Sequence, residues 1–324
     1  MTAWSHSGGT ARFRSASAPG EAGPLTVIGD MRVPARRALD WLNREADRFA
    51  AAEDGDPTAE SYQTALAELA LFLRIVTRNP LPGAARPILA RLTRALERAY
   101  RDPRLNGFIH TGPPEAAIGH VMIWLALDAS GLAEPVMPRQ HLVSALEARN
   151  IVAVPRPAMR FLELRLALDA LGLRHDLPDR ADFLAVSDLP GLLDSSNTAD
   201  LYMATHWLFY LTDFGRYTLP GAGELIPSMR KRLADVATAG HWDLTAEFLL
   251  AGACVHARPD ATSDAAWSAL GAAQDPAGHM TGPPENRPPF IRAYHTCLVA
   301  AWAGLAEAAN RQTGAAQHST RLHE

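Results

Sequence analysis

Residues 200–216 read Asp-Leu-Tyr-Met-Ala-Thr-His-Trp-Leu-Phe-Tyr-Leu-Thr-Asp-Phe-Gly-Arg. Apolar residues recur in this stretch at helical spacing, and a glycine follows the last turn, so the pattern predicts a helix. Tyr202, His206, Tyr210 and Asp213 are spaced so that they share a second face of that helix. A surface helix of this composition would carry Arg, Glu and Ala there. The stretch therefore predicts a helix that is buried on one side and faces a polar cavity on the other.

The composition is typical of a globular chain with a substantial core. The chain has 324 residues, of which 48% are hydrophobic and 20% charged, and the formal net charge is -4. This balance does not indicate nucleic acid or an anionic membrane as a partner. Cys254 and Cys297 are far apart in apolar runs, which favours buried thiols over a disulfide scaffold. With no apolar run of membrane length and no apolar signal core in residues 2–24, we expect a cytoplasmic protein.

Helical segments separated by short breaks account for most of the chain, and no pair of strands stands out. Residues 1–33 are short of large apolar side chains and are expected to form a flexible tail, as are residues 312–324. Between them, residues 34–311 are expected to form one domain. The predicted helices cover residues 34–52, 58–77, 84–100, 116–129, 135–149, 157–173, 179–186, 197–213, 222–237, 241–255, 262–273 and 289–309.

These segments group into six pairs in which a more polar helix tends to precede a more apolar one. A closed ring of helical hairpins requires this alternation, because its outer helices bury one face and its inner helices bury nearly all of theirs. The sequence Thr-Gly-Pro-Pro-Glu occurs at 111–115 and again at 281–285, each time before an apolar helix that carries a histidine, His120 or His295. Chance in a Pro-rich and Gly-rich chain is one explanation, and equivalent loops at the same end of a barrel is the other.

Six such hairpins resemble the α/α-toroid proteins, which include protein prenyltransferase β-subunits, class II terpene cyclases, lanthipeptide cyclases and many (α/α)6 glycosidases. Residues 293–297, Ala-Tyr-His-Thr-Cys, followed by Ala-Trp-Ala-Gly-Leu, are similar to a segment of the prenyltransferase β-subunits. The resemblance implies an (α/α)6-like toroid and, at His295, a zinc ligand. The Asp-x-Cys pair of that family and the acidic motifs of the terpene cyclases are absent, as is the Cys-His-Gly of lanthipeptide cyclases.

Four histidines fall in the early turns of the predicted inner helices: His120, His206, His241 and His295. Inner helices of an α/α ring run parallel, so their N-terminal ends meet at one mouth, where the helix dipoles attract anions by about 0.3–1 kcal/mol per helix end. A lone histidine on an apolar helix is usually a hydrogen-bonded core residue. Four of them on inner helices favour a shared site.

Asp243 and Glu247 lie four residues apart and share a helix face with each other. Capping of the helix N-terminus by Asp243 is one interpretation. The other is a carboxylate pair beside His206 and His295, in which closeness in a dry cavity raises one pKa and suits acid/base work. No motif requires a cofactor. Zinc is the metal that the resemblance implies, with His295 as its ligand, and His206 and Asp243 are the further candidate ligands if a metal is bound.

Further candidates flank this centre. Tyr202, Tyr210 and Tyr294 are expected to orient a substrate or to hydrogen-bond their neighbours. Asp213 either contributes to the same stripe or anchors the loop that follows it. Arg292 either binds a carboxylate or phosphate of the substrate or pairs with the acid of the loop at 281–285.

The sequence favours an enzyme of specialised metabolism that performs acid/base-assisted cyclisation, elimination or group transfer on a small molecule or a peptide. His206, Asp243, Glu247 and His295 are the predicted catalytic residues. A glycan hydrolase or lyase with two opposed carboxylates is one rival. A non-catalytic toroid that binds a leader peptide or a partner protein is the other, and it predicts that these four side chains do not converge.

Overall fold

The computed structural model describes residues 31–321 apart from 53–54, 80, 135 and 281–288. Within these residues the regular structure consists of fourteen α-helices and two short 3-10 helices, η1 (Ala46–Phe49) and η2 (Ile151–Ala153), without a β-strand. The prediction of an all-α chain is confirmed. The second Thr-Gly-Pro-Pro-Glu copy, at 281–285, lies outside the described residues, so the proposed equivalence of the two loops stays a prediction.

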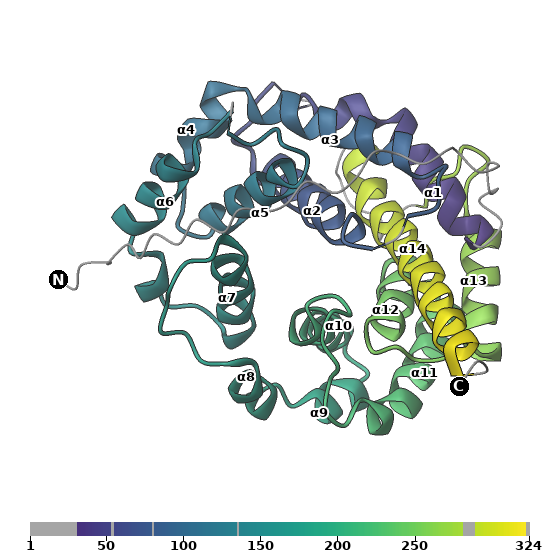
Figure 1. The fold of residues 1–324 in the computed structure, drawn as a ribbon. Helices are drawn as coiled ribbons and strands as arrows, with labels where there is room; N and C mark the ends of the chain where they lie inside the picture. Colours follow the sequence, from purple (N-terminus) through teal and green to yellow (C-terminus); the bar gives the residue numbers. More distant parts are fainter. Residues whose placement is uncertain (1–30, 53–54, 80, 135, 281–288, 322–324) are drawn as a thin grey trace.

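Six apolar helices form a closed inner ring in which each helix contacts the next and the last contacts the first (Figure 1). In ring order they are α2 (Glu60–Val76), α5 (Ala116–Asp128), α7 (Ala158–Leu171), α10 (Thr198–Thr212), α12 (Trp242–Cys254) and α14 (Pro289–Arg321). Aromatic and aliphatic residues cover most sides of these helices, and that is why they are buried between neighbours rather than at the surface.

The remaining helices form an outer layer around that ring (Figure 1). They are α1 (Val33–Arg44), α3 (Arg86–Tyr100), α4 (Pro103–Thr111), α6 (Arg139–Ala148), α8 (Arg180–Val186), α9 (Leu189–Asp194), α11 (Ala222–Thr238) and α13 (Ala261–Ala273). One or two of them precede each inner helix, so the chain alternates between the two layers six times. The inner helices consequently run in the same direction.

Two short helices, α4 and α9, were absent from the prediction. The sequence carried a signal for α4, because Asp102 accepts a hydrogen bond from the Arg104 backbone amide and Pro103 occupies the first helical position. The Leu-Pro pair at the start of α9 is a weaker form of the same signal. Because of α4 and α9, two outer helices precede each of α5 and α10, whereas one precedes each of the other inner helices.

The ring closes where the first helix packs on the last. Gly304 of α14 allows this approach, since a Cβ atom at that position would lie 2.3 Å from the Cβ of Ala35 on α1. Met31 is buried, and Arg32 pairs with Glu307 of α14 at 3.0 Å and with Asp264 at 2.6 Å. The predicted N-terminal tail therefore includes at least two residues that are part of the fold. Helix α14 likewise continues beyond the predicted end at 309.

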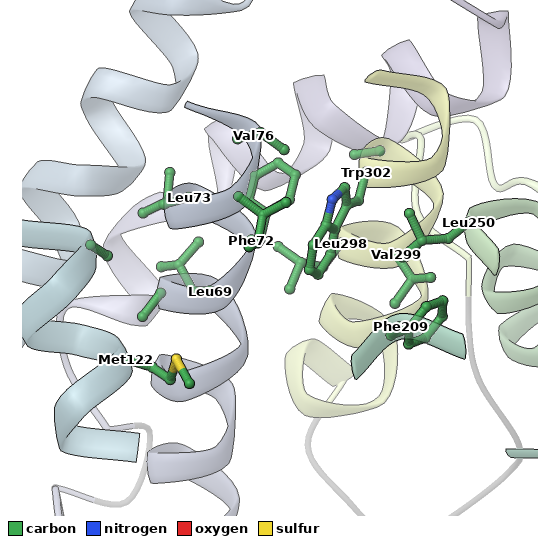
Figure 2. Packing of buried hydrophobic residues seen from close by; sticks show 14 of the residues in the cluster. Leu69, Phe72, Leu73, Val76, Met122, Phe209, Leu250, Leu298, Val299 and Trp302 are labelled. Carbon is green, nitrogen blue, oxygen red and sulfur yellow. The ribbon is translucent and has the colours of Figure 1, made fainter. Parts of the chain in front are cut away.

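Buried apolar side chains of α2, α5, α10, α12 and α14 belong to one hydrophobic cluster, part of which Figure 2 shows. Phe72 of α2 meets Trp302 of α14 edge to face, with ring centroids 6.0 Å apart. Phe214, just after α10, stacks on Trp302 at 4.6 Å and on Phe209 at 5.5 Å. This aromatic layer separates the polar side chains nearer the N-terminal ends of the inner helices from those at the C-terminal ends. None of the described helices has the length and hydropathy needed to cross a membrane.

Candidate active site

The imidazole of His295 on α14 lies among three carboxylates that come from two other inner helices. Its Nδ1 lies 2.8 Å from Oε2 of Glu68 on α2. Its Nε2 lies 3.4 Å from Oε1 of Glu247 and 3.6 Å from Oδ1 of Asp243, both on α12. Both ring nitrogens of His295 therefore face an acid, and residues separated by more than 200 positions in the chain converge on one group.

Local sequence explains why these side chains meet. Asp243 is in the first turn of α12, where a carboxylate is favoured by the helix dipole, and Glu247 follows one turn later on the same face. His295 is in the second turn of α14 and contacts α12 from the side. Glu68 is the acidic residue in the apolar middle of α2, which contacts α14 on its other flank. The ring order α12, α14, α2 thus places His295 in the middle.

A second set of side chains holds the carboxylates in place. Tyr202 donates its hydroxyl to Oδ2 of Asp243 at 2.8 Å, and Thr296 donates to Oδ1 at 3.0 Å. The Thr205 hydroxyl donates to Oε2 of Glu247. Because each donor comes from α10 or α14, the acids of α12 are fixed from both neighbouring helices. Each acid retains lone pairs directed at His295.

His206 lies beside this cluster on α10. Its Nδ1 donates to the backbone carbonyl of Tyr202 at 2.8 Å and lies 3.7 Å from Oε2 of Glu247. A neutral His206 with its proton on Nδ1 keeps the lone pair on Nε2. Its side chain is 31% exposed, close to the 30% of His295, whereas Glu247 is 1% exposed. Solvent therefore reaches the two imidazoles but not the base of the site.

The charges of this cluster are strongly coupled. Burial alone lowers the pKa of His295, but the charges of Glu68 and Asp243 outweigh it and hold this pKa well above 6.5. For Glu68, burial raises the pKa, but the charge and hydrogen bond of His295 outweigh burial and lower it. Burial raises the pKa of Asp243 above 3.8 despite the opposing charge of His295, and the Glu247 charge adds to the rise. His295 is therefore an imidazolium at neutral pH, and Asp243 takes up a proton more readily than an ordinary aspartate does.

Asp243, Glu247 and His295 also fit a divalent metal. One ligand atom from each lies within 4.8 Å of the other two. A set of one histidine and two carboxylates is a donor set that zinc accepts, and three protein ligands leave a position open for a substrate. Glu68 on Nδ1 of His295 would orient that ligand, as second carboxylates commonly do. Of the ligands expected from the sequence, His206 lies outside this group, and Glu247 takes its place.

Tyr202 and Tyr294 adjoin the centre, and Tyr210 lies one helical turn after His206. Tyr202 binds Asp243, and the side chain of Tyr294 hydrogen-bonds Glu68. Tyr210 is buried and hydrogen-bonds Glu163 of α7. Burial and the Glu163 charge raise the pKa of Tyr210 well above 10. All three position acids rather than stand free in the ring.

The structure does not bring His120 and His241, which were expected at the site, to the cluster around His295. His120 is 2% exposed, and its Nδ1 lies 3.2 Å from the hydroxyl of Tyr100 on the outer helix α3. Burial lowers the pKa of His120 to about 4, so it is a neutral core residue. His241 precedes α12 as its N-cap residue and is exposed. Position in an early turn was an insufficient criterion, because His120 points outward between the layers.

Asp213 and Arg292 also lie outside the cluster. Asp213 ends α10 with a positive φ and accepts from Arg78 at 3.2 Å, so it anchors the loop after the helix. Arg292 is one turn before His295 and is partly buried, with no hydrogen-bond partner for its Nε among the described residues. Its predicted partner, the acid of the 281–285 loop, falls outside those residues.

Three members of the centre were not predicted: Glu68, Thr205 and Thr296. Glu68 had a visible signal, because it is a single carboxylate inside the apolar run Ala65 to Phe72. The two threonines had none, since hydroxyls are common on buried helices and bond to the backbone of their own turn.

A search of family models matches residues 35–305 of this chain to a family described as a domain of unknown function, DUF6895. The match covers well over half of the chain. The chain belongs to the DUF6895 family. The matched span of this DUF6895 chain runs from α1 to α14 and includes every residue of the centre. No curated protein and no solved structure matches the chain.

Proposed function

We propose that this DUF6895 chain is an enzyme that performs acid/base chemistry on a small molecule or peptide, in a cyclisation, elimination or group transfer of specialised metabolism. The observation that carries the proposal is the position of His295, whose two nitrogens face Glu68 on one side and the Asp243–Glu247 pair on the other. Apolar side chains at these positions would stabilise the fold as well as this charged group does, because burying charges carries a large desolvation cost.

The residues divide into a donor and an acceptor. His295, charged at neutral pH, gives the proton on Nε2 to the substrate. The carboxylates of Asp243 and Glu247 take up the proton that the substrate releases, and the 3.4 and 3.6 Å contacts return it to Nε2. Glu68 stays ionised and keeps the imidazole oriented. The charge of the protein is unchanged after one cycle.

A divalent metal is compatible with the same residues. Asp243, Glu247 and His295 would hold it, and a bound metal supplies Lewis acidity that polarises a substrate oxygen. Glu68, Tyr202, Thr205 and Thr296 would keep the same orienting roles toward those three ligands.

The glycan hydrolase or lyase is less consistent with this geometry. That chemistry places one acid on each side of a sugar bond. Asp243 and Glu247 are both directed at Nε2 of His295 and lie on one helix, so a sugar bond has no place between them. The binding scaffold has one observation in its favour. A cavity of about 610 Å³ lies outside the centre, between α11, α12, α13 and the end of α14, with Met229 and Phe248 among its apolar lining residues.

The first test compares metal content across three proteins. Wild type, His295→Ala and His120→Gln would be purified without a tag and measured by inductively coupled plasma mass spectrometry. Stoichiometric zinc in wild type and His120→Gln, lost in His295→Ala, would establish the metal-dependent form of the proposal. The absence of metal from all three would leave the metal-free form.

Turnover would be measured by incubating small-molecule extracts with wild type, Glu247→Gln and His120→Gln, and following masses that change. We expect compounds that wild type and His120→Gln convert and Glu247→Gln does not. Compounds that remain bound to all three proteins without conversion would instead support the binding scaffold and overturn the enzyme.

A further inference from the structure

A cluster of three arginines lies at the C-terminal ends of the inner helices, on the far side of the aromatic layer from His295. Arg74 is in the last turn of α2, six residues or about 9 Å of helix rise beyond Glu68. Arg78 follows the helix and crosses the ring to Asp213 at the end of α10, with Nη1 3.2 Å from each carboxylate oxygen. Arg216 approaches the same carboxylate at 3.5 Å. Two guanidinium groups thus pair with one acid, and the charges of Arg78, Asp213 and Arg216 all act on Arg74.

Arg74 is the member whose hydrogen bonding is incomplete. The residue is 7% exposed, yet its hydrogen-bond partner is the thioether of Met122, 3.5 Å from Nη1, and a thioether is a weak acceptor. No carboxylate pairs with Arg74 among the described residues. No nitrogen of Arg74 is both buried and without a hydrogen-bond partner. The Arg74 nitrogens that have no partner are therefore in contact with solvent. An acceptor from outside can therefore reach them.

The nearby helix ends do not supply the missing acceptor. The Thr77 hydroxyl donates to the carbonyls of Leu73 and Arg74 at the end of α2, at 2.8 and 3.2 Å. Thr212 does the same for Leu208 at the end of α10, at 2.7 Å. The negative ends of these helix dipoles favour the positive charge of the arginines, but they leave donors of Arg74 without an acceptor.

We infer that Arg74, Arg78 and Arg216 bind an anionic group, a phosphate or a carboxylate, of a small-molecule ligand. Guanidinium groups present paired donors that match both anions. Burial, and next the charges of Arg78 and Arg216, lower the pKa of Arg74 to about 10, so the group is charged at neutral pH. Asp213 is close enough to position Arg78, but its single negative charge does not neutralise all three arginines.

The loop that carries Asp213 and Arg216 is held in a costly backbone conformation. Asp213, Phe214 and Gly215 have successive positive φ values of 44°, 56° and 89°. Non-glycine residues are disfavoured in this region, and such strain persists where the surrounding structure enforces it. The stacking of Phe214 on Trp302 and the Arg78–Asp213 pair supply that enforcement. The loop therefore presents Arg216 at a defined place.

Calorimetric titration of the full chain tests this inference without any turnover assay. Inorganic phosphate, and acetate in parallel, would be titrated at constant ionic strength maintained with sodium chloride. We expect saturable binding of phosphate to wild type. Binding of acetate as well would extend the ligand class to carboxylates, and binding of acetate alone would restrict it to them. No saturable heat with either anion would overturn the inference.

Substitutions then assign the binding to the three arginines. Arg74→Gln is expected to weaken binding by about tenfold or more, because it removes a charge-assisted hydrogen bond. Arg216→Gln removes a largely exposed side chain, preserves the fold and is expected to weaken binding several-fold. Asp213→Asn removes the competing carboxylate and is expected to strengthen it.

Arg101→Gln is the matched control, because Arg101 is a half-exposed arginine that pairs with Glu97 on the outer helix α3. If Arg216→Gln and Asp213→Asn bind as Arg101→Gln does, the anion lies elsewhere and the inference fails. His295→Ala should leave anion binding unchanged, so failure of the enzyme proposal and failure of this one are separable.

Discussion

His120 and His295 occupy similar places in the sequence and opposite environments in the fold. Each is a histidine in an early turn of an apolar inner helix, yet His120 faces Tyr100 between the layers and His295 faces three carboxylates inside the ring. Burial alone gives a neutral imidazole with a pKa of about 4 at His120. Burial acts in the same direction at His295, but the charges of Glu68 and Asp243 outweigh it and give an imidazolium. The charged partners of His295 therefore decide its protonation state.

Removal of the imidazolium should have the largest effect on stability. His295→Ala leaves Glu68, Asp243 and Glu247 without the positive charge between them, and an uncompensated buried charge costs about 3–5 kcal/mol. We expect the free energy of unfolding in urea at pH 7 to fall by about 3 kcal/mol, the lower end, because solvent reaches His295. The exposed His241→Ala is the control and should stay within about 0.5 kcal/mol of wild type. A loss below 1 kcal/mol for His295→Ala would show that the acids do not depend on this charge.

The two histidines should also give opposite dependences of stability on pH. The pKa of His120 is about 4 in the folded state, below the unfolded value of 6.5. The contribution of His120 to the free energy of unfolding is therefore lost as pH falls from 6.5 to 4. The full loss amounts to about 3 kcal/mol by pH 4. His295 has a raised folded pKa, so its contribution is complete below pH 6.5 and is lost as pH rises through the folded pKa.

Urea titrations of wild type and His120→Phe at pH 4, 5 and 6.5 separate the two contributions. We expect the gap in stability between the two proteins to shift by about 3 kcal/mol across this range, because the phenylalanine does not titrate. Parallel curves for the two proteins would mean that His120 keeps an ordinary pKa and is open to solvent.

The same two residues show how far the sequence could predict the site. Helical periodicity and the alternation of polar and apolar segments predicted an all-α chain with alternating layers, because those patterns record which faces are buried. They could not distinguish His120 from His295, since both faces of an inner helix are apolar and the direction of a side chain depends on the neighbouring helix. The i, i+4 relation of Asp243 and Glu247 is local and was read correctly. The contacts of Glu68 and Thr296 across the ring were not readable.

Replacement of Glu68 should have a smaller effect that reports on His295. The lowered pKa of Glu68 means that its contribution is present above pH 4.5 and is lost as pH falls through the folded pKa. Glu68→Gln is expected to cost about 1–2 kcal/mol at pH 7 and to lower the pKa of His295 toward 6.5 in an NMR titration of the imidazole signals. The control Glu97→Gln removes a surface pair and should cost less than about 0.5 kcal/mol. An unchanged His295 pKa in Glu68→Gln would assign its charge to the α12 acids alone.

Replacement of Asp243 should have the smallest effect on stability, and it should leave the stability unchanged or slightly raise it. Because burial raises the pKa of Asp243, its contribution to stability is present below pH 3.8 and is lost as pH rises through the folded value. Asp243→Asn keeps the shape and removes the charge; its oxygen accepts from one of the Tyr202 and Thr296 hydroxyls, and its amide nitrogen donates to the other. We expect unchanged or slightly higher stability at pH 7, by up to about 1 kcal/mol, together with loss of turnover or of metal binding. A loss of about 2 kcal/mol or more would instead show that the attraction between the Asp243 carboxylate and the His295 imidazolium exceeds the cost of burying the carboxylate.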